Sequence, residues 1–139
     1  MSNVNTIVSK LASIIPPVIA APPAYPFVGK NAVKASLLAN TEVQHLTLQM
    51  LYLLQTQDEQ QHRDTEVRNK CGFMSSDAYT GSVLAEKLLL GLELEGEEVA
   101  KAERIATKYS KQLAQQLVRH ACAQDARLAA YAITFSIKV

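Results

Sequence analysis

The sequence predicts a single all-α domain of four or five helices, with an N-terminal proline-rich extended strap and a C-terminal segment that forms either a short β-strand or more helix. Three observations carry this prediction. The chain has 139 residues, about one domain. All five prolines lie between Pro16 and Pro26, so the rest is free of the strongest helix breaker. Apolar residues recur at helical spacing through most of the remainder. We divide the chain into residues 1–29 (short helix and strap), 30–125 (helical domain) and 126–139 (tail).

The first segment, residues 4–15, is expected to form a short amphipathic helix. Its apolar residues lie three or four positions apart: Val4, Ile7, Val8, Leu11, Ile14 and Ile15. The prolines then hold about a dozen residues extended. This strap is apolar, so we expect it to lie on the protein's own surface; the alternative is a motif offered to a partner.

Residues 30–39 are expected to form a short helix, and a longer helix opens at Asn40–Thr41, where Thr41 and Gln44 have capping-box spacing. This longer helix is apolar nearly all round, which predicts that it is the buried central helix. Its polar continuation from Gln55 leaves the core or lines a cleft.

Gly72 marks a central turn, and a helix over residues 78–90 follows, closed by Gly91. One last helix begins near Glu97 and Glu98 and is expected to run unbroken to about Cys122. Residues 131–139 alternate apolar and polar side chains, which favours a half-buried strand, while the preceding alanines favour continued helix.

The net charge of +1 is a cancellation. Five glutamates and one lysine lie between residues 86 and 98, whereas residues 101–127 hold six cations and two acids. On a helix with about 100° per residue, five of these cations fall within an arc of roughly 80°. They are Lys101, Arg104, Lys108, Lys111 and Arg119. Such a stripe matches a nucleic-acid phosphate backbone, and the alternative is an ordinary solvated face.

The turn at Gly72 offers a second candidate contact. Phe73, with Arg68 and Lys70 beside it, would suit an exposed ring on which a base stacks. The alternative is that Phe73 packs into the core ahead of the next helix.

Metal binding and catalysis find little support. His62 with Cys71, and His120 with Cys122, are ligand types without the spacing of a zinc site, and we expect His120 to pack in the core. The acids near His62 have the pattern of surface ion pairs. These acids are Asp58, Glu59, Asp64 and Glu66. We expect no enzyme, no metal and no cofactor.

No apolar run reaches the roughly 18 residues that span a bilayer, so we expect no membrane association. The two cysteines, Cys71 and Cys122, fit a reducing compartment, and the cytoplasm is the expected location.

A set of residues in the middle half of the chain also resembles a known pattern. It begins with Gln55-Thr56-Gln57-Asp58-Glu59-Gln60 and continues through the expected turns and helices that follow. These are Asn69, Gly72-Phe73, Asp77-Ala78, Gly81, Leu84-Ala85, Gly91, Lys108-Tyr109 and Gln112-Leu113. The pattern resembles a helical module of unassigned role found in bacterial and phage DNA-processing proteins, some of which also carry helicase domains. The resemblance implies a nucleic-acid context and carries no catalytic residues.

The sequence therefore favours a non-enzymatic accessory protein that binds DNA or RNA, single strands included, along the basic helix face. The alternative is a helical subunit of a homo-oligomer or of a larger nucleoprotein complex, docking by its apolar termini.

Overall fold

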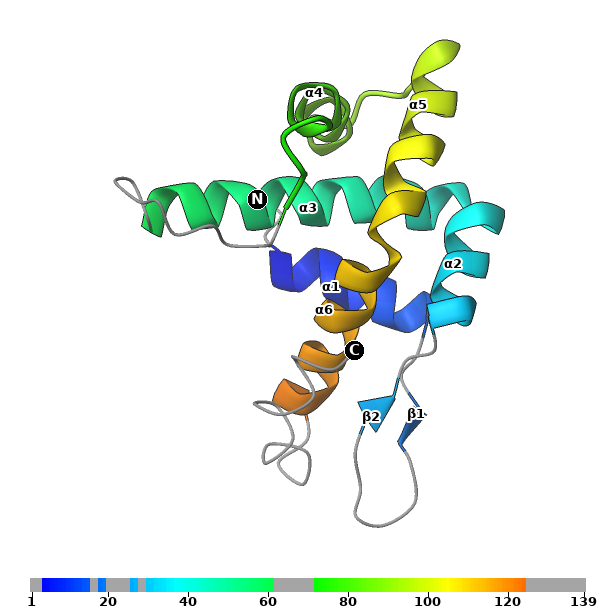
Figure 1. Cartoon of the computed structure of the whole chain (residues 1–139), viewed down its shortest axis with the longest axis vertical. Helices are drawn as coiled ribbons and strands as arrows, with labels where there is room; N and C mark the ends of the chain where they lie inside the picture. Colours follow the sequence, from blue (N-terminus) through cyan, green and yellow to red (C-terminus); the bar gives the residue numbers. More distant parts are fainter. Residues whose placement is uncertain (1–3, 16–17, 20–25, 28–29, 62–71, 125–139) are drawn as a thin grey trace.

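The computed structural model of the chain is an all-α bundle, as the sequence predicts. It describes residues 4–15, 18–19, 26–27, 30–61 and 72–124 (Figure 1). Within these ranges six α-helical segments, one 3₁₀ segment and two very short strands follow one another. They are α1 (Val4–Ile14), β1 (Val18–Ile19), β2 (Pro26–Phe27), α2 (Lys30–Ala39), α3 (Thr41–Gln61), α4 (Ala78–Leu89), α5 (Glu97–Ala106), η1 (Thr107–Tyr109) and α6 (Ser110–Gln124).

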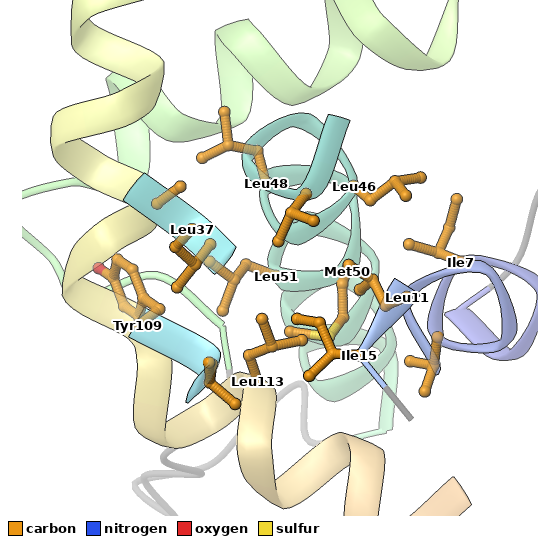
Figure 2. Close-up of a cluster of buried hydrophobic side chains, with 14 of the residues drawn as sticks. Ile7, Leu11, Ile15, Leu37, Leu46, Leu48, Met50, Leu51, Tyr109 and Leu113 are labelled. Carbon is orange, nitrogen blue, oxygen red and sulfur yellow. The ribbon is translucent and has the colours of Figure 1, made fainter. Parts of the chain in front are cut away.

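The central helix is α3, which crosses the whole bundle (Figure 1). It contacts α1, α2, α4 and α5. Leu48, Met50 and Leu51 on α3 have no exposed surface, and Figure 2 shows them among side chains from α1, α2 and α6. The prediction of a buried central helix is confirmed, because a helix that is apolar on every side is stable only with neighbours on every side.

The prediction that Thr41 and Gln44 form a capping box at the start of α3 is wrong. Asn40, one position earlier, accepts hydrogen bonds at Oδ1 from the backbone N–H groups of Glu42 (2.9 Å) and Val43 (3.3 Å). The Gln44 amide instead donates to the Leu37 carbonyl oxygen at 2.7 Å. Gln44 thus satisfies a carbonyl near the C-terminus of α2 and fixes the corner between the two helices.

Helix α1 belongs to the same core as the rest of the bundle. Ile7, Leu11 and Ile15 are 1%, 0% and 6% exposed, and α1 packs on α3 and α6 (Figure 2). The amphipathic helix is therefore confirmed.

The strap doubles back where the structure describes it. Val18 pairs with Phe27 and Ile19 with Pro26 in an antiparallel register, so β1 and β2 form a two-stranded ladder rather than one extended run. β2 lies beside α6, in agreement with a strap held on the protein's own surface. The tail, residues 126–139, with its choice between strand and helix, lies outside the described residues.

The predicted single last helix is wrong, because it is divided into α5, η1 and α6 (Figure 1). Thr107 Oγ1 donates to the carbonyl oxygens of Glu103 (2.9 Å) and Arg104 (3.1 Å). A threonine hydroxyl that bonds back in this way competes with the helix ladder and bends it. The tighter 3₁₀ turn follows directly, and the chain changes direction before α6.

Candidate nucleic-acid interface

A buried polar cluster joins the segment before α4 to the bend between α5 and α6. The Asp77 side chain lies at its centre and the residue is only 6% exposed. Tyr109 Oη donates to Asp77 Oδ2 at 2.7 Å, and Lys108 Nζ lies 3.2 Å from Asp77 Oδ1. The same Tyr109 oxygen accepts the backbone N–H of Met74 at 2.9 Å. Two partners therefore satisfy the buried carboxylate, which would otherwise destabilise the fold.

Burial controls the ionisation of the tyrosine in this cluster. Desolvation, together with the hydrogen bond and charge of Asp77, raises the pKa of Tyr109 to about 12 against the opposing effect of the Met74 N–H. Tyr109 therefore stays a neutral donor to Asp77, and its role here is structural.

Two glutamine side chains hold the Gly72–Phe73 turn. Gln112 pairs with both backbone polar atoms of Gly72, and Gln55 Oε1 accepts the backbone N–H of Phe73 at 3.3 Å. Gly72 has a φ of +94°, and a Cβ there would lie 2.8 Å from the Gln55 Cβ. Only glycine fits this turn, for both reasons.

Phe73 packs inward from the turn. Its ring meets the Tyr109 ring edge-on, with centroids 5.9 Å apart and planes at 88°. A Cβ added at Gly81 would lie only 2.5 Å from the Phe73 ring. The ring therefore fills the space that Gly81 leaves on α4. The expectation of a free ring for base stacking is corrected, and the alternative of a core-packed Phe73 describes this structure.

Several described residues of the sequence pattern lie in this same cluster. Hydrogen bonds, ring contacts or close packing join Gln55, Gly72, Phe73, Asp77, Gly81, Lys108, Tyr109 and Gln112. Leu84, Ala85 and Leu113 of the pattern are buried core residues. These described residues pack the turn against α3, α4 and η1.

All five cations predicted to form a stripe are exposed: Lys101, Arg104, Lys108, Lys111 and Arg119. In the part of the chain that the structure describes, no carboxylate forms an ion pair with Lys101, Arg104, Lys111 or Arg119. Lys108 differs, because Asp77 holds its ammonium although the side chain is 44% exposed. Arg68 and Lys70 lie outside the described residues.

The bend changes the shape of the predicted stripe. Lys101 and Arg104 lie on α5, whereas Lys111 and Arg119 lie on α6, so the cations follow two helix axes rather than one (Figure 1). The roughly 80° arc assumed one straight helix. We call these four exposed cations, two on each helix, the basic face: Lys101, Arg104, Lys111 and Arg119.

The far end of the basic face borders a groove between α1 and α6, with a cavity volume of about 730 Å³. Lys10 from α1 lines it opposite Arg119 and His120 from α6. His120 is partly buried in this wall. The sequence did not indicate Lys10, because its proximity to Arg119 depends on the packing of the two ends of the chain.

The acids gather at the other end, around the α4–α5 connection. Glu93, Glu95 and Glu97 are exposed there, while Glu98 accepts from Lys87 Nζ at 2.8 Å with both carboxylate oxygens. The Lys87 ammonium lowers the pKa of Glu98, with help from the Glu95 backbone N–H. The acid-rich segment of the sequence is thus exposed around the α4–α5 connection, one helical turn before Lys101.

Comparison with family models, with curated proteins and with solved structures finds no match. Among the described helices none is both long and apolar enough to cross a membrane. The described side chains contain no group of three or more metal-ligating residues. His62, Cys71, Asp64 and Glu66, and the side chains of Asp58, Glu59 and Cys122, lie outside the described set.

Proposed function

We propose that this protein is a non-enzymatic accessory protein that binds the phosphate backbone of DNA or RNA along the basic face. The observation that carries the proposal is that four cations on α5 and α6 are exposed without an acidic partner among the described residues. Each phosphate that a lysine or arginine neutralises releases condensed counterions, so exposed and unpaired cations favour binding.

The geometry narrows the set of contacts. Lys108 is removed from the proposed interface, because breaking its pair would leave the buried Asp77 carboxylate poorly compensated. Phe73 is removed because its ring is packed against Tyr109 and Gly81. Lys10 is added, because it shares the groove with Arg119. Arg68 and Lys70 remain proposals from the sequence.

The proposed interface is divided between two helices, with Lys101 and Arg104 on α5 and Lys111 and Arg119 on α6, where Arg119 lines the α1–α6 groove. A flexible single strand follows such a surface more easily than a straight duplex does, because bending a single strand costs less free energy than bending a duplex. We therefore expect single-stranded DNA or RNA to bind more tightly than duplex DNA of the same length.

The test measures fluorescence anisotropy of labelled single-stranded DNA, duplex DNA and RNA of mixed sequence at a series of salt concentrations. The variant Lys111→Ala with Arg119→Ala should weaken binding and lower the slope of log affinity against log salt by roughly 1.4 for single strands, about 0.7 for each lost contact. Lys34→Ala on α2 is a control that removes one exposed cation outside the basic face, and Gln115→Ala truncates a side chain between the two cations without changing charge.

Both controls should bind as the wild type does. Equal affinity and salt slope in the double variant would remove the basic face as the site, and a wild type that binds none of the three probes would overturn the function.

The second candidate is an assembly subunit that docks by apolar termini. Docking by the N-terminal segment loses support, because the apolar face of α1 is buried in the protein's own core. Docking by the C-terminal segment is tested by light scattering on a chain lacking residues 131–139. An unchanged monomer would count against it.

A further inference from the structure

The outward face of α4 carries large apolar side chains that the fold leaves uncovered. Tyr79 is 83% exposed, Val83 40% and Leu90, the residue that ends the helix, 77%. At 100° per residue these three lie on one side of the helix. The opposite side packs against the bundle through Gly81, Leu84 and Ala85. Helix α4 therefore has apolar residues on two faces, whereas packing against the bundle uses only one of them.

The exposed apolar residues continue beyond the helix. Leu92 in the connection is 52% exposed, and Val99 in the first turns of α5 is 40% exposed. We call the five residues the α4 surface: Tyr79, Val83, Leu90, Leu92 and Val99. Single exposed apolar residues are common on protein surfaces. Several of them on one helix face and the segment that follows it indicate an interaction site. Tyrosine, the most exposed of the five, is enriched among residues that dominate protein interfaces.

The border of the α4 surface is acidic. Glu86 lies on the same side of α4, and Glu93, Glu95 and Glu97 are exposed along the connection and the start of α5. The cation in this stretch, Lys87, is neutralised by Glu98 at 2.8 Å. A partner segment that covers the apolar row would therefore meet negative charge along its edge, and lysine or arginine would be favoured there.

We propose that the α4 surface docks a basic amphipathic segment of a partner protein, most simply a helix with an apolar stripe between lysine or arginine side chains. This inference does not depend on nucleic-acid binding, since it rests on exposed apolar side chains and acids that are not part of the basic face.

The charge distribution disfavours a second copy of this chain as the occupant. Two α4 surfaces facing each other would bring their acidic borders together. The basic face of a second copy would supply the charge but no apolar stripe, because the other exposed large apolar residues among those described are Leu38 on α2 and Met74 before α4.

The test uses a synthetic amphipathic helical peptide of leucine and lysine as the probe, with binding followed by isothermal titration calorimetry on the full chain. Two further peptides serve as comparisons: one with the same residues in scrambled order, and one with glutamate in place of lysine. We expect binding of the first peptide that weakens with salt, and at least tenfold weaker binding of the other two.

The variant Tyr79→Ser with Leu90→Ser should weaken binding of the leucine–lysine peptide at least tenfold. Both side chains are mainly exposed, so the variant should unfold at the wild-type denaturant concentration. Leu38→Ser is the matched control on α2, and Glu93→Gln with Glu95→Gln tests the acidic border, where a loss of about threefold or more is expected.

Equal binding of the ordered and scrambled peptides, or wild-type affinity in the Tyr79 and Leu90 variant, would overturn the proposal. Sedimentation of the wild type as a dimer that this variant converts to a monomer would also overturn it, in favour of a second copy as the occupant.

Discussion

Gln112 on α6 holds Gly72 by both of the glycine's backbone polar atoms. Its Oε1 accepts the Gly72 N–H at 2.9 Å, and its Nε2 donates to the Gly72 carbonyl oxygen at 3.0 Å. A single side chain thus replaces the backbone partners that the turn cannot find within a helix or sheet. The pairing joins residues 40 positions apart, so it fixes the turn only when α6 is in place.

Gln112→Ala should lower the free energy of unfolding by about 1–3 kcal/mol, because two buried backbone groups lose their partners together. Urea denaturation followed by circular dichroism measures the change. Gln115→Ala, one turn along α6, is the control and should have little effect. A Gln112→Ala midpoint equal to that of the wild type would show that water replaces the amide at no cost.

Gly81→Ala should destabilise the protein although alanine is the better helix former. The gain in helix propensity is at most about 1 kcal/mol, whereas forcing the Phe73 ring to move costs about 1–3 kcal/mol. The clash predicts its own suppressor: Phe73→Leu in the Gly81→Ala background should recover part of the loss. Ser82→Ala controls for substitution in α4. A more stable Gly81→Ala chain would mean that the ring moves freely.

Tyr109 should make stability fall at high pH. An unfolded tyrosine has a pKa of 10.0, against about 12 in the fold. Between these values the unfolded chain has lost a proton that the folded chain keeps, so it binds fewer protons and stability decreases as pH rises. The contribution is complete below pH 10 and amounts to at most about 2–3 kcal/mol.

The stability difference between the wild type and Tyr109→Phe should therefore shrink from pH 10 to 12, as measured by urea denaturation at each pH. Tyr79→Phe, on the exposed α4 surface, is the comparison that should show no such trend. A constant difference between the wild type and Tyr109→Phe would contradict the raised pKa.

His45 should make stability fall at low pH. Its Nε2 is buried without a hydrogen-bond partner in the described part of the chain, and desolvation lowers the pKa of His45 below 6.5. The unfolded chain therefore takes up a proton first as pH falls, so the loss of stability that this titration causes is absent well above pH 6.5 and grows below it.

His45→Phe should be more stable than the wild type by about 1–3 kcal/mol if the ring fits, because the unpaired polar atom is gone. Its advantage should widen as pH falls below 6.5. His45→Gln separates the two effects, since it removes the titration but keeps a polar group. Parallel pH profiles for all three chains would contradict the account.

The helices of this protein are determined locally, which is why their positions could be predicted. Apolar spacing placed α1 and the buried α3, and the absence of prolines after Pro26 allowed helix through the rest of the chain. Each of these signals is contained within a few turns of the residues it describes, so no knowledge of neighbours is needed. The capping residue of α3 was missed by one position, because Asn40 and Thr41 are adjacent and both residue types are common at helix N-termini.

The candidate site depends on tertiary structure. Sequence alone determined which cations the chain has and that they follow one another at helical spacing. Only the fold decided that Lys108 is bound by Asp77, that Thr107 and η1 bend the stripe, and that Lys10 joins Arg119 across a groove. The physical reason is that the neighbours of a cation decide whether it can bind a ligand. In this protein those neighbours, a buried carboxylate and a facing helix, come from distant parts of the sequence, so local spacing and charge do not indicate them.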